Sequence, residues 1–85
     1  MKHEFRVGDV FRVNWESQGL AGDFDILTAV AVLKDDKVVD WVWERGLKSS
    51  DSFQVLYKGI EKGEWVFLYN RFDRAELHEM IGYDS

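Results

Sequence analysis

Hydrophobic and polar residues alternate with a period of two along several parts of the chain, a pattern typical of half-buried β-strands. The alternation predicts strands at about 4–15, 53–58 and 64–70, and an apolar, β-branched-rich run that is interrupted only at Asp35 and Asp36 predicts two more at about 26–34 and 37–44. Because only these two aspartates separate the strands predicted at 26–34 and 37–44, we expect the two strands to form a hairpin. Residues 16–25 and 45–52 show no sustained periodicity, and we expect irregular connections there.

The end of the sequence predicts one short helix, at about 74–81. Asp73 is the expected N-cap, and Glu76 follows three residues later as its capping-box partner. Leu77 and Ile81 lie one turn apart, so one face of this helix is apolar. A helix of about two turns does not form alone in water, and we therefore expect it to pack on the sheet.

These elements predict a mainly β fold with a minor α component, in a single domain that spans residues 1–85. We expect a small antiparallel sheet of five or six strands, rolled into a barrel-like form. The segment from Val7 to Val13 (VGDVFRV) resembles the opening strand of SH3-like small barrels, where a glycine turn leads into a paired strand. The resemblance covers only this segment. It implies an SH3-like barrel and assigns no family.

Composition agrees with a folded core and bears on the compartment. The hydrophobic share is 46% and the aromatic share 15%, and each aromatic side chain can bury roughly 150–250 Å². The chain has no cysteine, which excludes disulfides and thiolate metal sites. The longest apolar run, residues 27–33, is far shorter than the ~20 residues that cross a bilayer. Charged residues follow Met1 in place of a signal core, so we expect a cytoplasmic protein without a membrane segment.

The sequence offers few groups for catalysis. His3 and His78 are its two histidines, and neither stands in a pattern with a nucleophile and an orienting acid. Phosphate-binding loops, dinucleotide fingerprints, zinc-protease helices and nucleophile elbows do not occur. We therefore expect no enzyme activity. A small hydrolase or metal-dependent enzyme that uses Asp23 and Asp25 is a third interpretation, after the two given below.

Two pairs of carboxylates are candidates for binding. Asp23 and Asp25 lie on the same side of an extended segment, and Asp35 and Asp36 share a turn. Their oxygen ligands would suit Mg²⁺ or Ca²⁺, although neither pair follows an EF-hand loop. Capping of loops and turns explains both pairs. We accordingly expect no metal and no cofactor.

Aromatic side chains concentrate in the paired strands. Trp41 and Trp43 share one face of their strand, and three aromatics of residues 64–69 also share a face. Two interpretations are open. Either this face is the core, or some of the aromatics stay exposed beside acidic residues and anchor a partner.

Charge favours a protein partner over nucleic acid. The net charge is −5, and residues 23–46 hold six acids and three bases, whereas phosphate binding relies on a basic surface. We predict a non-catalytic binding module whose partner is a protein with a basic surface, such as an inhibitor, an antitoxin-like protein or a phage-type protein acting on a host. The predicted binding residues are Asp23, Asp25, Asp35, Asp36, Asp40, Trp41 and Trp43. The alternative is an SH3-like or OB-like module that binds nucleic acid or a modified peptide by stacking on exposed aromatics.

Overall fold

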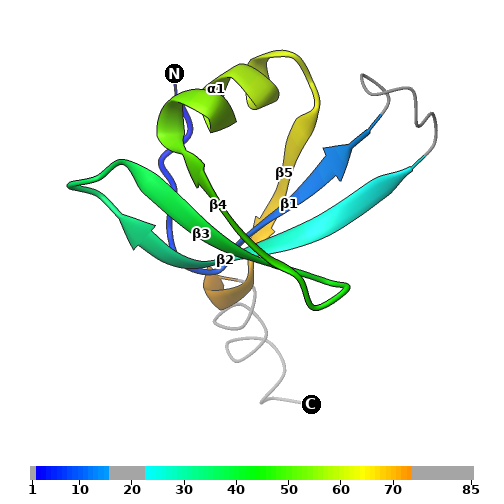
Figure 1. The fold of residues 1–85 in the computed structure, drawn as a ribbon, viewed down its shortest axis with the longest axis horizontal. Helices are drawn as coiled ribbons and strands as arrows, with labels where there is room; N and C mark the ends of the chain where they lie inside the picture. Colours follow the sequence, from blue (N-terminus) through cyan, green and yellow to red (C-terminus); the bar gives the residue numbers. More distant parts are fainter. Residues whose placement is uncertain (1, 16–22, 74–85) are drawn as a thin grey trace, which may run out of the picture.

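The computed structural model describes residues 2–15 and 23–73. Its elements in chain order are β1 (Asp9–Asn14), β2 (Phe24–Leu33), β3 (Val38–Trp43), β4 (Lys48–Ser52), α1 (Phe53–Glu61) and β5 (Trp65–Asn70). The five strands form one antiparallel sheet in the order β4-β3-β2-β1-β5 (Figure 1). The prediction of a mainly β, antiparallel fold is confirmed. The sheet is open, with β4 and β5 as its edges.

β1 is an interior strand of the sheet, between β2 and the edge strand β5, although it comes first in the sequence. Phe11 of β1 is opposite Leu27 of β2 and opposite Phe67 of β5. β2 and β3 form the predicted hairpin. Its turn comprises residues 34–37 rather than the two aspartates alone, and Lys37 has a positive φ of 56°. Across residues 2–15 and 23–73, no helix is both long and apolar enough to cross a membrane.

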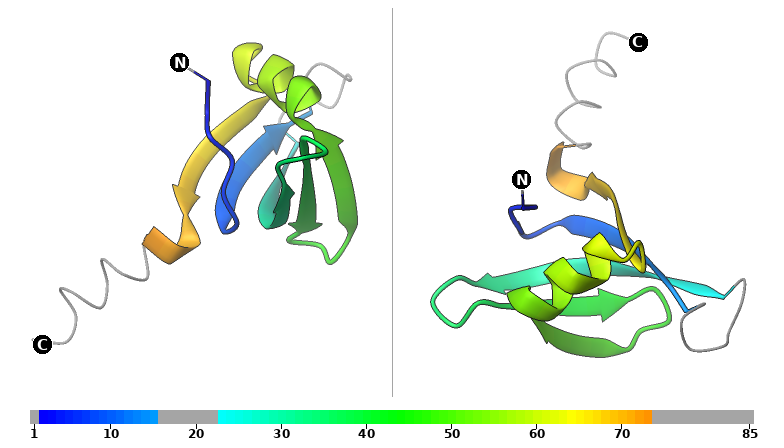
Figure 2. Two further views of the ribbon diagram at one scale, coloured as in Figure 1. Left: turned by 90° about the vertical axis from the view of Figure 1, so that its left-hand side faces the viewer. Right: turned by 90° about the horizontal axis from the view of Figure 1, so that it is seen from above.

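The core lies on one face of the curved sheet, which we call the inner face. α1 packs on this side and contacts both edge strands, and the chain before β1 runs along it as well (Figure 2). The buried core consists of Phe5, Phe11, Val13, Leu27, Ala29, Val39, Trp41 and Leu56. Full burial of such a side chain contributes about 1.5–3 kcal/mol. The sheet, α1 and the N-terminal segment are therefore held together mainly by this cluster.

The prediction of a strand at 53–58 is wrong, because these residues belong to the helix α1. The side chain of Ser52 caps the helix by accepting a hydrogen bond from the backbone N–H of Val55, at 3.3 Å. The residues of α1 that pack on the core recur at helical spacing and are Phe53, Leu56, Tyr57 and Ile60. A short stretch of alternating apolar residues is compatible with one face of a helix as well as with a strand. The helical spacing of the packed residues and the cap at Ser52 distinguish the helix from the strand.

Two further predictions of local structure need correction or fall outside the described chain. β4 occupies part of residues 45–52, where we expected only an irregular connection. Residues 71–73 are helical, and their cap is Asn70 rather than Asp73, since Asn70 Oδ1 accepts from the N–H of Phe72 at 2.9 Å and of Asp73 at 3.3 Å. The helix predicted at 74–81 lies outside the described residues.

Candidate functional site

The two predicted carboxylate pairs lie at opposite ends of β2. Asp35 and Asp36 are exposed in the hairpin turn that follows the strand, and Asp23 precedes it. A strand of ten residues spans roughly 30 Å, so the structure does not bring these pairs together. Lys34 and Lys37 flank the turn pair and offset its charge. Binding by these exposed acids stays a prediction, but they cannot form one compact site.

Asp25 is engaged inside the protein. Its carboxylate is buried and accepts a hydrogen bond from Trp15 Nε1 at 2.7 Å. Arg45 donates to the same carboxylate from Nε at 2.6 Å and from Nη2 at 3.0 Å. Such a bidentate, charge-assisted pair ties β2 to the turn between β3 and β4. Within residues 2–15 and 23–73, no group of three or more His, Asp or Glu side chains is arranged to hold a metal ion.

Both predicted tryptophan anchors face the core. Trp41 is 1% exposed and packs edge-on against Phe11, with ring centroids 5.5 Å apart. Trp43 is half-buried, stacks on Trp15 at 5.9 Å and donates from Nε1 to Ser49 Oγ at 2.8 Å. The first interpretation of the aromatic face therefore holds for these two residues. Neither is the exposed anchor that the second interpretation required.

The opposite side of the sheet, which we call the outer face, is also apolar. Its positions alternate with those of the core, and its apolar members are Val10, Phe24, Ile26, Val30, Ala31, Leu33, Val38, Val42, Val66 and Tyr69. Within the described chain, five of them are between 38% and 50% exposed, namely Phe24, Val30, Leu33, Val66 and Tyr69. A one-sided antiparallel sheet normally carries polar residues at such positions. This outer face is the most conspicuous candidate for a site.

An open groove with a volume of about 560 Å³ lies on the outer face, across β2, β3 and β4. Val30 and Val42 supply its apolar lining, and Asp40 and Lys48 supply opposite charges. Ser50 Oγ donates to Asp40 Oδ1 at 2.6 Å, which holds this carboxylate in place. Two of the predicted binding residues, Asp40 and Trp41, line this groove, and the side chain of Trp41 is packed into the core.

A β-bulge in β2 forms part of this groove. The register between β2 and β3 shifts between Ala29 and Ala31, so Val30 is the extra residue of the bulge. Bulges redirect a side chain and are common beside functional sites. Elsewhere on the outer face, the guanidinium of Arg12 in β1 lies over the ring of Phe24 in β2, 4.3 Å from its centroid. The outer face therefore combines apolar surface with a few fixed charges.

Sequence reasoning missed the outer face, although a signal for it exists. From Phe24 to Leu33 nearly every residue is apolar, without the polar alternation of a strand that has one solvated face. Unbroken apolar runs are typical of strands that are buried on both faces. This run, interpreted in that way, would have predicted a second apolar surface.

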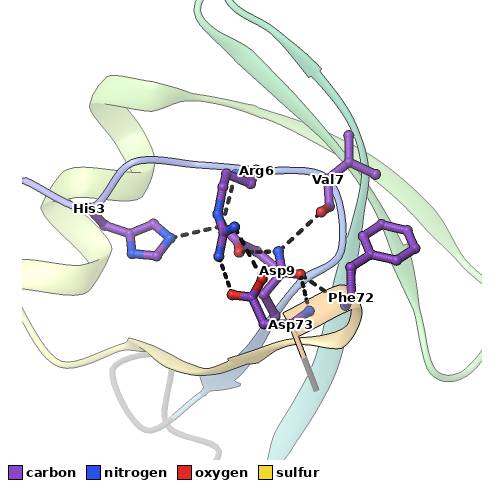
Figure 3. A network of polar contacts seen from close by, with 7 residues as sticks. His3, Arg6, Val7, Asp9, Phe72 and Asp73 are labelled. Atoms are coloured by element: carbon purple, nitrogen blue, oxygen red, sulfur yellow. Dashed lines mark hydrogen bonds and ion pairs between the residues drawn. The ribbon is translucent and has the colours of Figure 1, made fainter. Parts of the chain in front are cut away.

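A buried polar network ties the N-terminal segment to β1 and β5 (Figure 3). The fully buried carboxylate of Asp9 accepts from the backbone N–H of Arg6 at 2.9 Å and from Asn70 Nδ2 at 2.9 Å, and it is hydrogen-bonded to His3 Nε2 at 2.8 Å. Arg6 forms an exposed ion pair with Asp73 at 2.6 Å, and this hydrogen bond lowers the pKa of the Asp73 carboxyl. These contacts satisfy the polar atoms of the network and hold the N-terminal segment against β1 and β5.

Comparison with protein-family models, with curated proteins and with solved structures finds no match to this chain.

Proposed function

We propose that this protein is a non-catalytic module that binds another protein through the outer face of its sheet. The observation that carries the proposal is a sheet that is apolar on both faces, of which the described chain covers the inner one. Burial of apolar surface stabilises a complex by about 25 cal/mol per Å² before the costs of association. Exposed apolar areas beyond a few hundred Å² commonly mark interaction sites.

Charged residues at the border of the outer face support a partner with a basic rim. Asp23 lies beyond one end of β2, Asp40 lines the groove, and the chain has a net charge of −5, whereas Lys34 and Lys37 offset Asp35 and Asp36 at the other end of β2. Charges in such rim positions act mainly on the rate of association. In its most specific form, the proposal is an inhibitor or antitoxin-like protein that covers a basic surface of a target, as a phage-type protein does to a host enzyme.

We also propose that the sheet is a partly rolled, SH3-like barrel. Two features support this finer description. α1 joins the end of β4 to the start of β5 and contacts both strands, so it bridges the two edges (Figure 1). Gly8, with a φ of 95°, makes the turn that leads into β1, as expected for the opening segment from Val7 to Val13.

The proposed function is tested with two variants of similar chemistry on different surfaces. Val30→Asp places a charge in the groove of the outer face, and Leu47→Asp places one at an equally exposed apolar residue in the turn before β4. Proteins captured from the native host by the wild-type chain should also be captured by Leu47→Asp and should be lost with Val30→Asp. Retention of the same partner by Val30→Asp would contradict the proposal.

The stacking alternative makes a different prediction in the same samples. Trp41 and Trp43 are packed, so exposed aromatics of the outer face such as Phe24 would have to receive the bases. Fluorescence anisotropy with single-stranded DNA and RNA measures this binding directly. Tight binding that falls steeply as salt rises, with no protein partner recovered, would favour the alternative.

A further inference from the structure

One wall of the groove on the outer face consists of hydrogen-bond acceptors. Asp40 of β3 and Ser50 of β4 lie directly opposite each other in the paired strands, and both line the groove. The hydroxyl of Ser50 donates its proton to Asp40 Oδ1 at 2.6 Å, so the remaining lone pairs of both side chains stay available to donors. Within the described chain, no ion pair joins Asp40 to a basic residue. The groove therefore offers a carboxylate and a neighbouring hydroxyl oxygen to a cationic group with several donors.

The apolar part of the groove lies beside these acceptors. Val42 is two residues from Asp40 in β3 and faces the same side of the sheet. Val30, the extra residue of the bulge in β2, is 50% exposed and also lines the groove. A long side chain with an aliphatic stem and a charged head suits such a combination, because the stem can cover apolar surface while the head stays at the polar end.

Lys48 is the competing charge in the groove. It is opposite Val42 and therefore a diagonal neighbour of Asp40. Lys48 is exposed at the start of the edge strand β4, whereas Asp40 is half-buried on an interior strand and is held by Ser50. A group that is already fixed loses less freedom when it binds. Asp40 should therefore decide the sign of the charge that the groove accepts.

We propose that the groove receives an arginine side chain of the partner protein. Its stem lies on Val30 and Val42, and its guanidinium donates to Asp40 and Ser50. The planar fork of guanidinium donors matches two neighbouring acceptors, whereas the ammonium of lysine is a compact point charge. The inference rests on the proposed function and specifies it, since it names the residue type that the outer face binds.

NMR titration of the full chain with a defined probe tests the specificity of the groove. The probe is a blocked pentapeptide with one arginine between glycines, added at ~0.15 M salt to screen unspecific attraction. The backbone amide signals of Val30, Asp40 and Val42 should shift saturably. The same peptide with citrulline, an uncharged analogue of arginine, should bind about tenfold more weakly or worse, and the lysine peptide should lie between them.

Three results of this titration would overturn the proposal. They are no saturable shift with the arginine peptide, equal binding of the citrulline peptide, and preferred binding of the corresponding glutamate peptide. The last result would mean that Lys48, rather than Asp40, is the charge that recognises the ligand.

A pair of matched variants assigns the effect to Asp40. Asp40→Asn keeps an oxygen that can accept from Ser50 and removes the charge, so it should weaken binding of the arginine peptide by about tenfold. Glu61→Gln removes the same charge from an exposed residue at the end of α1, on the other side of the sheet, and should leave binding unchanged. Circular dichroism confirms that both variants are folded. Equal affinities of Asp40→Asn and wild type, or equal losses in both variants, would contradict the assignment. If Asp40→Asn fails to fold, the comparison of arginine with citrulline on the wild type decides.

Capture of partners from the native host separates failure of this inference from failure of the proposed function. A partner that is lost with Val30→Asp and kept by Asp40→Asn would leave the proposed function standing and overturn the role of arginine. A partner that is kept by Val30→Asp would contradict the proposed function, whereas selective binding of the arginine peptide would still support the specificity of the groove. Loss of the partner with both variants, and not with Glu61→Gln, is the result that we expect.

Discussion

Both faces of the sheet carry apolar residues, but they differ in what covers them. On the inner face, Leu27 is 1% exposed beneath an aromatic cluster that includes Phe11 and Trp41. On the outer face, Val30 follows three residues later in the same strand and is 50% exposed. Folding of the described chain buries the apolar residues of the inner face, whereas on the outer face it buries Val10 and leaves five other apolar residues between 38% and 50% exposed. In a small domain, some hydrophobic residues stabilise the core and others form an exposed surface that can bind a partner. The burial of each side chain distinguishes the two groups.

The inner face should show the largest effect on stability. Trp41→Ala removes a fully buried side chain that contacts Phe11 and Trp65, and we expect a loss of about 3–5 kcal/mol in the free energy of unfolding. Denaturant unfolding followed by fluorescence or circular dichroism measures it. A loss below about 1 kcal/mol would mean that Trp41 is not part of the central core.

The polar clamp beside the inner face should rank second. Asn70→Ala removes the hydrogen bond to Asp9 and the cap of residues 71–73 together, and we expect a loss of about 2–3 kcal/mol. Asn14→Ala is the control, because Asn14 is less buried and its side chain bonds only to exposed neighbours in the described chain. Denaturant unfolding measures both variants. Equal losses in the free energy of unfolding would show that the buried Asp9 network adds nothing to stability.

The outer face should contribute little to folding. Val30→Ser replaces a half-exposed side chain, and we expect the free energy of unfolding to change by no more than about 0.5 kcal/mol. The same unfolding experiment compares it directly with Trp41→Ala. A loss close to that of Trp41→Ala would indicate that the outer face is part of a second core.

Two carboxylates should affect the pH dependence of stability in opposite directions. Burial raises the pKa of Asp51 above that of the unfolded chain, so ionisation of this carboxyl destabilises the fold as pH rises from the unfolded pKa to the folded pKa. Relative to wild type, Asp51→Asn should therefore gain stability between acid and neutral pH. The hydrogen bond from Arg6 lowers the pKa of Asp73, so Asp73→Asn should be less stable than wild type at neutral pH, and this difference should vanish at acid pH. Thermal unfolding at a series of pH values checks both signs. Parallel curves would contradict them.

The sequence was informative where one local pattern dominated. Alternation and apolar runs located the β2–β3 hairpin and β5 to within a few residues, whereas β1 begins at Asp9, five residues later than the strand predicted at 4–15. Alternation failed at α1, where Phe53, Val55 and Tyr57 mimic a strand although the packed stripe continues to Ile60. It also missed β4, because an edge strand of serines and charged residues has the composition of a loop.

The candidate site was less predictable than the fold, for a physical reason. Whether Trp41 is core or anchor depends on which face α1 covers, and α1 was itself predicted as a strand. Asp25 was a candidate ligand because its partner Arg45 is twenty residues away and meets it only in the folded chain. Long-range pairing of this kind leaves no local pattern to interpret.

Cysteine accessibility tests the central claim most directly, namely that the outer face is open in the folded protein. The chain has no cysteine, so single substitutions can be labelled without background. In the full chain under native conditions, Val30→Cys should react with a thiol reagent at nearly the rate of an unfolded control. Leu27→Cys, on the inner face of the same strand, should react only through rare opening and therefore much more slowly. Protection of Val30→Cys to the level of Leu27→Cys, in the absence of any partner, would contradict the account.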